Sequence, residues 1–131
     1  MASDDVGKLI LRVSLGGLML IHGISKLFGG IDGIISLVQE AGLPGVFAYG
    51  VYLGEVVAPL LMIAGFWTRP AAAVFAFNMV VAVALAHPGD LLEIRGAWGV
   101  ELQALFFFGA VAVAFLGAGR YSASRGRGRL D

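Results

Sequence analysis

Four long stretches of nearly uninterrupted apolar residues divide this chain, and short runs of glycine, proline and polar residues separate them. The stretches cover about residues 8–28, 46–67, 70–87 and 98–118. A helix of about 20 residues, at a rise of about 1.5 Å per residue, matches a hydrocarbon core of about 30 Å. The pattern therefore predicts an all-α fold, a four-helix transmembrane bundle that forms a single domain over residues 1–119.

The connection between the first two stretches, GGIDGIISLVQEAGLPG, is too short and too interrupted to span a membrane. Asp32 is placed to cap a short helix, and Gly42 and Pro44 are placed to end it. One side of that helix would be apolar, formed by Ile34, Ile35, Leu37 and Val38. We therefore expect a short interfacial or re-entrant helix between spans one and two.

Proline positions predict two further local features. Pro59 lies one turn after Glu55 in the second stretch, so the helical hydrogen-bond ladder should loosen there. The sequence after that stretch, Phe-Trp-Thr-Arg-Pro, indicates a tight turn, with Thr68 as a helix cap and Pro70 in the first turn of the next helix. Spans two and three should therefore be antiparallel neighbours.

Composition supports a membrane location. Hydrophobic residues make up 59% of the chain and charged residues only 14%, whereas soluble domains average about 45–50% and about 25%. The amino terminus, MASDDVGK, is acidic, unlike the basic start of a cleaved signal peptide, so the first stretch is expected to be a retained span. The chain contains no cysteine, which excludes thiolate chemistry and cysteine-ligated metal clusters within it. Any redox role would need a bound cofactor or a partner.

Positive charges predict the orientation. Lys8, Arg69 and the four arginines of residues 120–131 fall on one side of the predicted bundle, whereas the connections on the other side carry only Arg95. By the positive-inside rule both termini are predicted to be cytoplasmic. Residues 120–131, rich in Gly, Ser and Arg, are predicted to be a disordered tail near anionic lipid, and they do not indicate nucleic-acid binding.

Ionisable residues inside the apolar stretches mark the candidate site. The first stretch carries His22 and Lys26 one helical turn apart, on a face that continues back to Arg12. A charge at membrane depth costs at least about 2.5 kcal/mol, so it normally has a partner. The second and fourth stretches supply Glu55 and Glu101. The orientation brings these groups into the outer half of the bundle, with Lys26 and Glu101 as a predicted ion pair and His22 and Glu55 as a deeper hydrogen-bonded pair.

Two interpretations of this cluster stay open. The pairs could simply hold the helices in register, but interhelical polar contacts average only about 0.6 kcal/mol, which is little gain for inserting four ionisable groups. The alternative is a small-molecule pocket in which His22 and Glu55 exchange protons while Lys26 and Glu101 hold the mouth. Its predicted walls and further ligand contacts are Met19, Tyr52, Trp98, Phe108 and Asn78.

The polar residues suggest two other roles. Arg12 is expected to be an anchor on the cytoplasmic side, or to bind Asn78 or groups of the tail. A metal site formed by His22, Glu55, His87 and Glu101 is not predicted, because no two of these residues share the short spacing of a strong metal motif.

The apolar stretches carry three sets of sequence motifs. They are R-x-x-x-G-x-x-x-x-x-H-G-x-x-K from Arg12 to Lys26, G-E at Gly54 with a later G-x-x-T-R-x-A-A from Gly65, and W-G-x-E from Trp98 to Glu101. In their order and spacing these motifs resemble the DoxX family of small four-span bacterial membrane proteins. The resemblance covers about residues 8–118. It implies a multi-pass protein of the bacterial inner (plasma) membrane.

The resemblance also implies candidate functions, since the family includes the small membrane subunit of a thiosulfate:quinone oxidoreductase and a membrane partner in an oxidative-stress complex. We therefore expect a quinone-linked subunit of a membrane oxidoreductase, with quinone as cofactor near His22, Glu55 and Glu101. Its expected partners are the lipid bilayer and a soluble redox enzyme subunit. Thiosulfate chemistry within this cysteine-free chain is not expected. One alternative is a small-solute or ion carrier or channel that uses the same site, for which a homo-oligomer is expected. The other is a non-catalytic membrane scaffold that anchors soluble redox enzymes.

Overall fold

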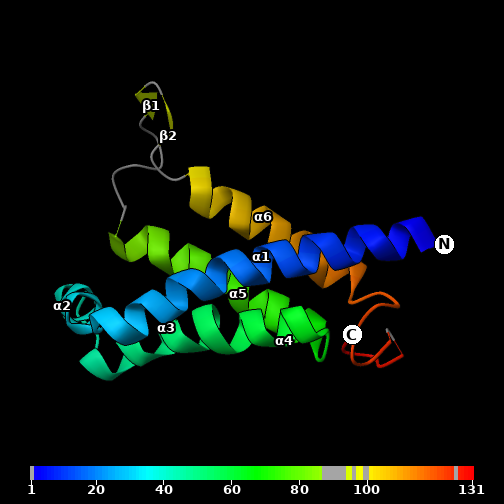
Figure 1. Ribbon diagram of the computed structural model, residues 1–131. Coiled ribbons are helices and arrows are strands. Elements are labelled where there is room, and N and C mark those ends of the chain that lie inside the picture. Colours follow the sequence, from blue (N-terminus) through cyan, green and yellow to red (C-terminus); the bar gives the residue numbers. More distant parts are fainter. Residues whose placement is uncertain (1, 87–93, 96, 99–100, 126) are drawn as a thin grey trace.

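The computed structural model describes residues 2–86, 94–95, 97–98, 101–125 and 127–131, and it is built from helices (Figure 1). The elements in chain order are α1 (Ala2–Gly29), α2 (Asp32–Glu40), the 3₁₀ segment η1 (Gly45–Tyr49), α3 (Gly50–Tyr52), the π-helical segment η2 (Leu53–Val57), α4 (Ala58–Ala64), α5 (Thr68–Ala86), β1 (Ile94–Arg95), β2 (Ala97–Trp98) and α6 (Glu101–Leu116). The two short strands pair antiparallel, with Ile94 opposite Trp98. The all-α prediction is confirmed.

Two helical runs of the described residues, Ser3–Ser25 and Gly45–Ala64, are long and apolar enough to cross a membrane by length and composition. The apolar helices Thr68–Ala84 and Leu102–Leu116 are shorter. Large apolar side chains nevertheless point outward from α1, α5 and α6, including Ile21, Phe77, Leu105 and Phe115. Soluble monomers rarely expose such continuous apolar surface, so hydrocarbon is the medium that suits these faces.

α2 is the short helix that the sequence predicts between the first two stretches. It ends as expected, since Gly42 takes a φ of 86° and the N–H of Leu43 bonds to the carbonyl of Val38 at 3.2 Å, the pattern of a Schellman motif. Its beginning differs from the prediction. Ile31 occupies the cap position without a side-chain hydrogen bond, and Asp32 is the first helical residue, where its charge favours the positive end of the helix dipole.

The turn between α4 and α5 is tight, as predicted, but Thr68 is not its cap. Trp67 precedes the helix with a φ of 49°, and its carbonyl accepts the N–H of Ala71 at 3.0 Å. Thr68 is the first residue of α5, and its Oγ1 is buried without a hydrogen-bond partner within the ranges that the structure describes. The cap is shifted by one residue because the chain reverses at Trp67.

Two apolar clusters hold the helices together. The larger one joins α1, α4, α5 and α6 through buried residues that include Met19, Met62, Phe75, Phe106 and Val113. The smaller one lies under α2 and contains Ile31, Val38 and Ala48. α5 packs along α6 and α4, while α1 packs along α4, η2 and α6.

The last residues of the chain run back to the α4–α5 turn, beside the amino-terminal end of α1 (Figure 1). The N–H of Ala123 bonds to the carbonyl of Ala64 at 2.8 Å, and the N–H of Arg69 bonds to the carbonyl of Leu130 at 2.9 Å. Main-chain hydrogen bonds thus connect the tail to the α4–α5 turn, and the predicted disorder of residues 120–131 stays a prediction.

Candidate functional site

The second helical run is interrupted at Glu55, and Pro59 supplies the reason. A proline has no N–H, so the carbonyl four residues earlier, that of Glu55, loses its α-helical partner, and the proline ring crowds the same carbonyl. The helix widens into the π-helical segment η2 (Leu53–Val57) around this point. The predicted loosening near Glu55 is therefore confirmed. Such π segments occur frequently at functional sites.

α1 makes its closest approach to this segment at Gly23. A Cβ built on Gly23 would collide with the Glu55 carbonyl oxygen and would lie 2.8 Å from Cγ2 of Val56. Only a residue without a side chain fits here. Close helix packing therefore explains why a glycine follows His22 in the motif of the first stretch. The contact brings the part of α1 that carries His22 directly against the part of η2 that carries Glu55.

α5 meets the same segment through Asn78. The Asn78 side chain fills the space beside Gly54, where a Cβ would overlap it and lie 2.8 Å from its Oδ1. Glu55 is only 4% exposed and Asn78 only 8% exposed. The Asn78 Nδ2 atom is buried and has no hydrogen-bond partner among the described residues. A buried amide donor without a partner is costly, about 1–3 kcal/mol, and native structures contain few of them.

His22 lies at the edge of this region, exposed on α1. Its Nδ1 lies 3.0 Å from the carbonyl of Leu18, and its ring meets Phe106 of α6 edge to face at 6.2 Å between centroids. Because a carbonyl only accepts hydrogen bonds, the contact requires the proton on Nδ1, and Nε2 is then the acceptor of the neutral ring. The hydrogen bond given by this imidazole thus runs within α1, and the predicted bond between His22 and Glu55 stays a prediction.

The apolar surroundings differ in part from the predicted walls. Met19 is 2% exposed and belongs to the larger cluster, as does Phe106, which the sequence analysis did not single out. Phe108 is 67% exposed and points away from the bundle, so its expected place in the wall is wrong. Tyr52 is half-buried and packs against the smaller cluster under α2. The inward phenylalanine of the Phe106–Phe108 run could not be chosen from the sequence, because all three residues are equally apolar.

Several predicted site residues lie outside what the structure describes. His87 is outside the described residues, and the same is true of the side chains of Lys26, Trp98 and Glu101. The predicted pair of Lys26 and Glu101 therefore stays a prediction. Within the ranges that are described, no group of three or more His, Cys, Asp or Glu side chains is arranged to hold a metal ion.

The fold and this site together define a helical membrane protein with a buried polar centre between α1, η2 and α5. The family model named DoxX matches residues 7–88, more than half of the chain. The chain belongs to the DoxX family, as its motifs indicated. The matched region includes His22, Glu55 and Asn78.

Two relatives show the same similarity. "Putative oxidoreductase CatD" of Bacillus subtilis (strain 168) is 35% identical over 81 residues, which is 62% of this chain and 60% of that protein. "Inner membrane protein YphA" of Escherichia coli (strain K12) is 31% identical over 88 residues, 66% of this chain and 62% of that protein. The match thus spans about three fifths of each relative's length. No solved structure matches the chain.

Proposed function

We propose that this DoxX-family membrane protein is the quinone-binding subunit of a membrane oxidoreductase, with Glu55, Asn78 and His22 around the quinone headgroup. The observation that carries the proposal is the buried amide of Asn78, whose Nδ2 has no hydrogen-bond partner in the part of the chain that the structure describes. It lies beside Gly54 and next to Glu55 in a π-helical segment. A polar ligand with an acceptor oxygen would satisfy that amide.

The residues present fit a quinone by their chemistry. A quinone carries two carbonyl oxygens on a flat apolar ring, so it needs hydrogen-bond donors at its oxygens and apolar or aromatic side chains against its faces. Asn78 Nδ2 is such a donor, and Met19 and Phe106 are buried apolar side chains of the adjacent cluster. Glu55 is a buried carboxyl group within the same region.

A bound quinone would supply the two-electron redox chemistry that this chain's own side chains lack. Each reduction takes up protons, and Glu55 and His22 are groups that can hold and release them. With the Nδ1 proton held toward the Leu18 carbonyl, His22 Nε2 is the atom that gains or gives the proton. Asn78 would bind and orient without titrating. The electrons would come from a soluble partner subunit, and the "oxidoreductase" in the name of the CatD relative agrees with this role.

We propose that the helices form four spans of the inner membrane with both termini in the cytoplasm. α5 has 19 residues and α6 has 16 residues, about 28 and 24 Å at about 1.5 Å per residue. Helices somewhat shorter than the hydrocarbon core are accommodated by local thinning of the bilayer at modest cost. Both chain ends lie at one end of the bundle (Figure 1), together with Lys8 and Arg69, which agrees with the positive-inside rule.

The test is the quinone content of gently purified protein, measured by organic extraction, mass spectrometry and a reduced-minus-oxidised ultraviolet spectrum. We expect near-stoichiometric quinone in the wild type and at least a tenfold lower content in Glu55→Gln. Glu40→Gln is the matched control, because Glu40 is an exposed carboxylate on α2. It should keep the quinone.

Thermal unfolding of the same proteins after removal of bound quinone separates a ligand site from a structural clasp, because bound ligand itself raises the melting temperature. Loss of quinone from Glu55→Gln, with a melting temperature equal to that of the quinone-free wild type, supports the proposal. Unchanged quinone in Glu55→Gln and His22→Ala, or no quinone in any sample, would show that it is wrong. Flux of small solutes into proteoliposomes would then test the carrier alternative.

A further inference from the structure

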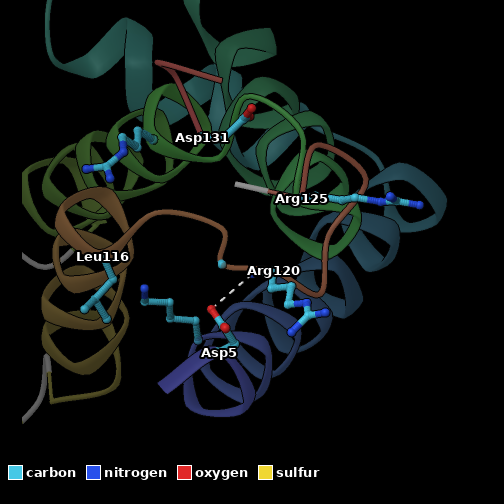
Figure 2. Close-up of a pocket in the computed structure, with 8 residues that line it drawn as sticks. Asp5, Leu116, Arg120, Arg125 and Asp131 are labelled. Atoms are coloured by element: carbon cyan, nitrogen blue, oxygen red, sulfur yellow. Dashed lines mark hydrogen bonds between the residues drawn. The ribbon is translucent and has the colours of Figure 1, made fainter. Parts of the chain in front are cut away.

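A second polar site lies at the opposite end of the bundle, where the tail meets the beginning of α1. The structure has a cavity of about 300 Å³ there (Figure 2). Four basic residues and two acidic ones line it: Lys8, Arg69, Arg120, Arg125, Asp5 and Asp131. The six side chains carry a formal excess of two positive charges, so the cavity favours an anion.

The two carboxylates are already engaged by main-chain donors. Asp5 Oδ1 accepts the N–H of Arg120 at 3.2 Å, the bond drawn in Figure 2. Asp131 accepts the N–H of Trp67 at 2.8 Å and that of Gly128 at 3.2 Å. These bonds hold the tail in place and use part of the acceptor capacity of both groups. The carboxylates therefore hold the tail segment that forms part of the cavity wall, and they also offset some of the positive charge.

The cations come from separated parts of the chain. Lys8 lies on α1 and Arg69 at the beginning of α5, where its Nη1 donates to the carbonyls of Ala114 and Phe115 at 3.1 and 2.9 Å. These bonds fix the position of the Arg69 guanidinium. Figure 2 shows the side chains of Arg120 and Arg125 directed outward from the rim. Lys8 and Arg69 are thus carried by helices. The other two cations are long, exposed arginine side chains of the tail, which can fold over an incoming anion.

The location points to the headgroup layer. The exposed side chains of Phe66 and Trp67 stack at 5.7 Å on the adjoining turn, and Tyr121 is also exposed. Exposed aromatic residues of this kind mark the membrane interface. Leu116, 46% exposed, gives the cavity an apolar edge. A ligand at this site can therefore place a phosphate among the cations and carbon atoms against Leu116.

We infer that this cavity binds a phosphate group, and that the group is carried by an anionic phospholipid of the cytoplasmic leaflet. The inference rests on the cavity and its charges, and it does not depend on quinone binding at the other end. Free inorganic phosphate offers the same chemistry without the apolar part. The experiment must therefore separate these two sources.

The experiment measures the melting temperature of detergent-solubilised protein during titration with short-chain phosphatidylglycerol, short-chain phosphatidylcholine, or inorganic phosphate at constant ionic strength. We expect phosphatidylglycerol alone to raise it. The double variant Lys8→Gln/Arg120→Gln should bind that lipid at least tenfold more weakly, since each basic residue contributes about fivefold. The matched control, Arg127→Gln/Arg129→Gln, removes two exposed tail charges that do not line the cavity and should bind like the wild type.

A second pair of variants keeps the test independent of folding defects. Lys8→Arg retains the charge and should retain binding, whereas Asp5→Asn removes a negative charge and should tighten it. Equal stabilisation of the wild type by the two lipids, or equal weakening in both double variants, would overturn the site. If inorganic phosphate reproduces the rise with the same dependence on Lys8 and Arg120, the phosphate site is supported and the lipid source is wrong.

Discussion

Arg12, in the first apolar helix, is bonded to the main chain just beyond the last helix. Its Nη1 donates to the carbonyl of Ala118 and its Nη2 to the carbonyl of Tyr121, both at 2.7 Å. The side chain is only 1% exposed. A buried guanidinium thus satisfies carbonyls that follow the end of α6 and holds the beginning of the tail. Of the roles predicted for Arg12, the structure confirms the binding to groups of the tail.

Replacing Arg12 should release the tail. Arg12→Lys keeps the charge but cannot bridge both carbonyls with a planar fork, so at least one charge-assisted hydrogen bond is lost, about 1.5–3 kcal/mol. We expect trypsin to cleave the tail about tenfold faster or more, because cleavage follows the population of the opened segment. Arg127→Lys, at an exposed tail position, is the control and should leave the cleavage pattern of the other sites unchanged. Equal protection in Arg12→Lys and wild type would contradict this role.

Two glycines of α1 allow a matched test of helix contact. Gly23→Ala places a Cβ against the Glu55 carbonyl, whereas Gly17 has nothing within 4 Å of the corresponding position. We expect Gly23→Ala to lower the free energy of unfolding in detergent by about 1–3 kcal/mol through overpacking. Gly17→Ala should be neutral or stabilising by up to about 1 kcal/mol, as expected from helix propensity. Similar melting temperatures for the two variants would show that α1 and η2 are not in contact at Gly23.

Pro59→Ala should separate helix stability from ligand binding. The alanine N–H can bond to the Glu55 carbonyl and convert η2 to a regular α-helix, which shifts the register of Glu55. We therefore expect at least tenfold less bound quinone, together with unchanged or higher thermal stability when both proteins are compared free of quinone. Pro70→Ala is the control, because a proline in the first turn of a helix interrupts no ladder bond. Full quinone content in Pro59→Ala would show that the π segment is not needed for the site.

The sequence predicts the helices well because hydropathy reports burial in lipid or protein directly. It also predicts the loosened ladder at Glu55, since a missing N–H is a local property of Pro59. It is harder to predict which residues share a helix face on either side of the π segment. Tyr52 and Glu55 share a face at 3.6 residues per turn, but a π segment changes that angle, and Tyr52 packs under α2. The held tail depends on Arg12, more than a hundred residues away in sequence, which no local pattern reveals.

Asn78→Leu should distinguish a ligand-binding amide from a structural one. The two side chains have similar size, and no described residue forms a hydrogen bond with Asn78 Nδ2. If the amide serves a ligand, its removal relieves a buried unsatisfied donor, so the ligand-free protein should be unchanged or up to about 2 kcal/mol more stable. The quinone content of the same variant should be at least tenfold lower than that of the wild type. A gain in stability at the cost of ligand binding is the trade-off expected at a binding site. The measurement pairs chemical unfolding of delipidated protein with the quinone assay. A destabilised Asn78→Leu that still holds quinone would assign Asn78 to helix packing and leave Glu55 and His22 as the groups that face the ligand.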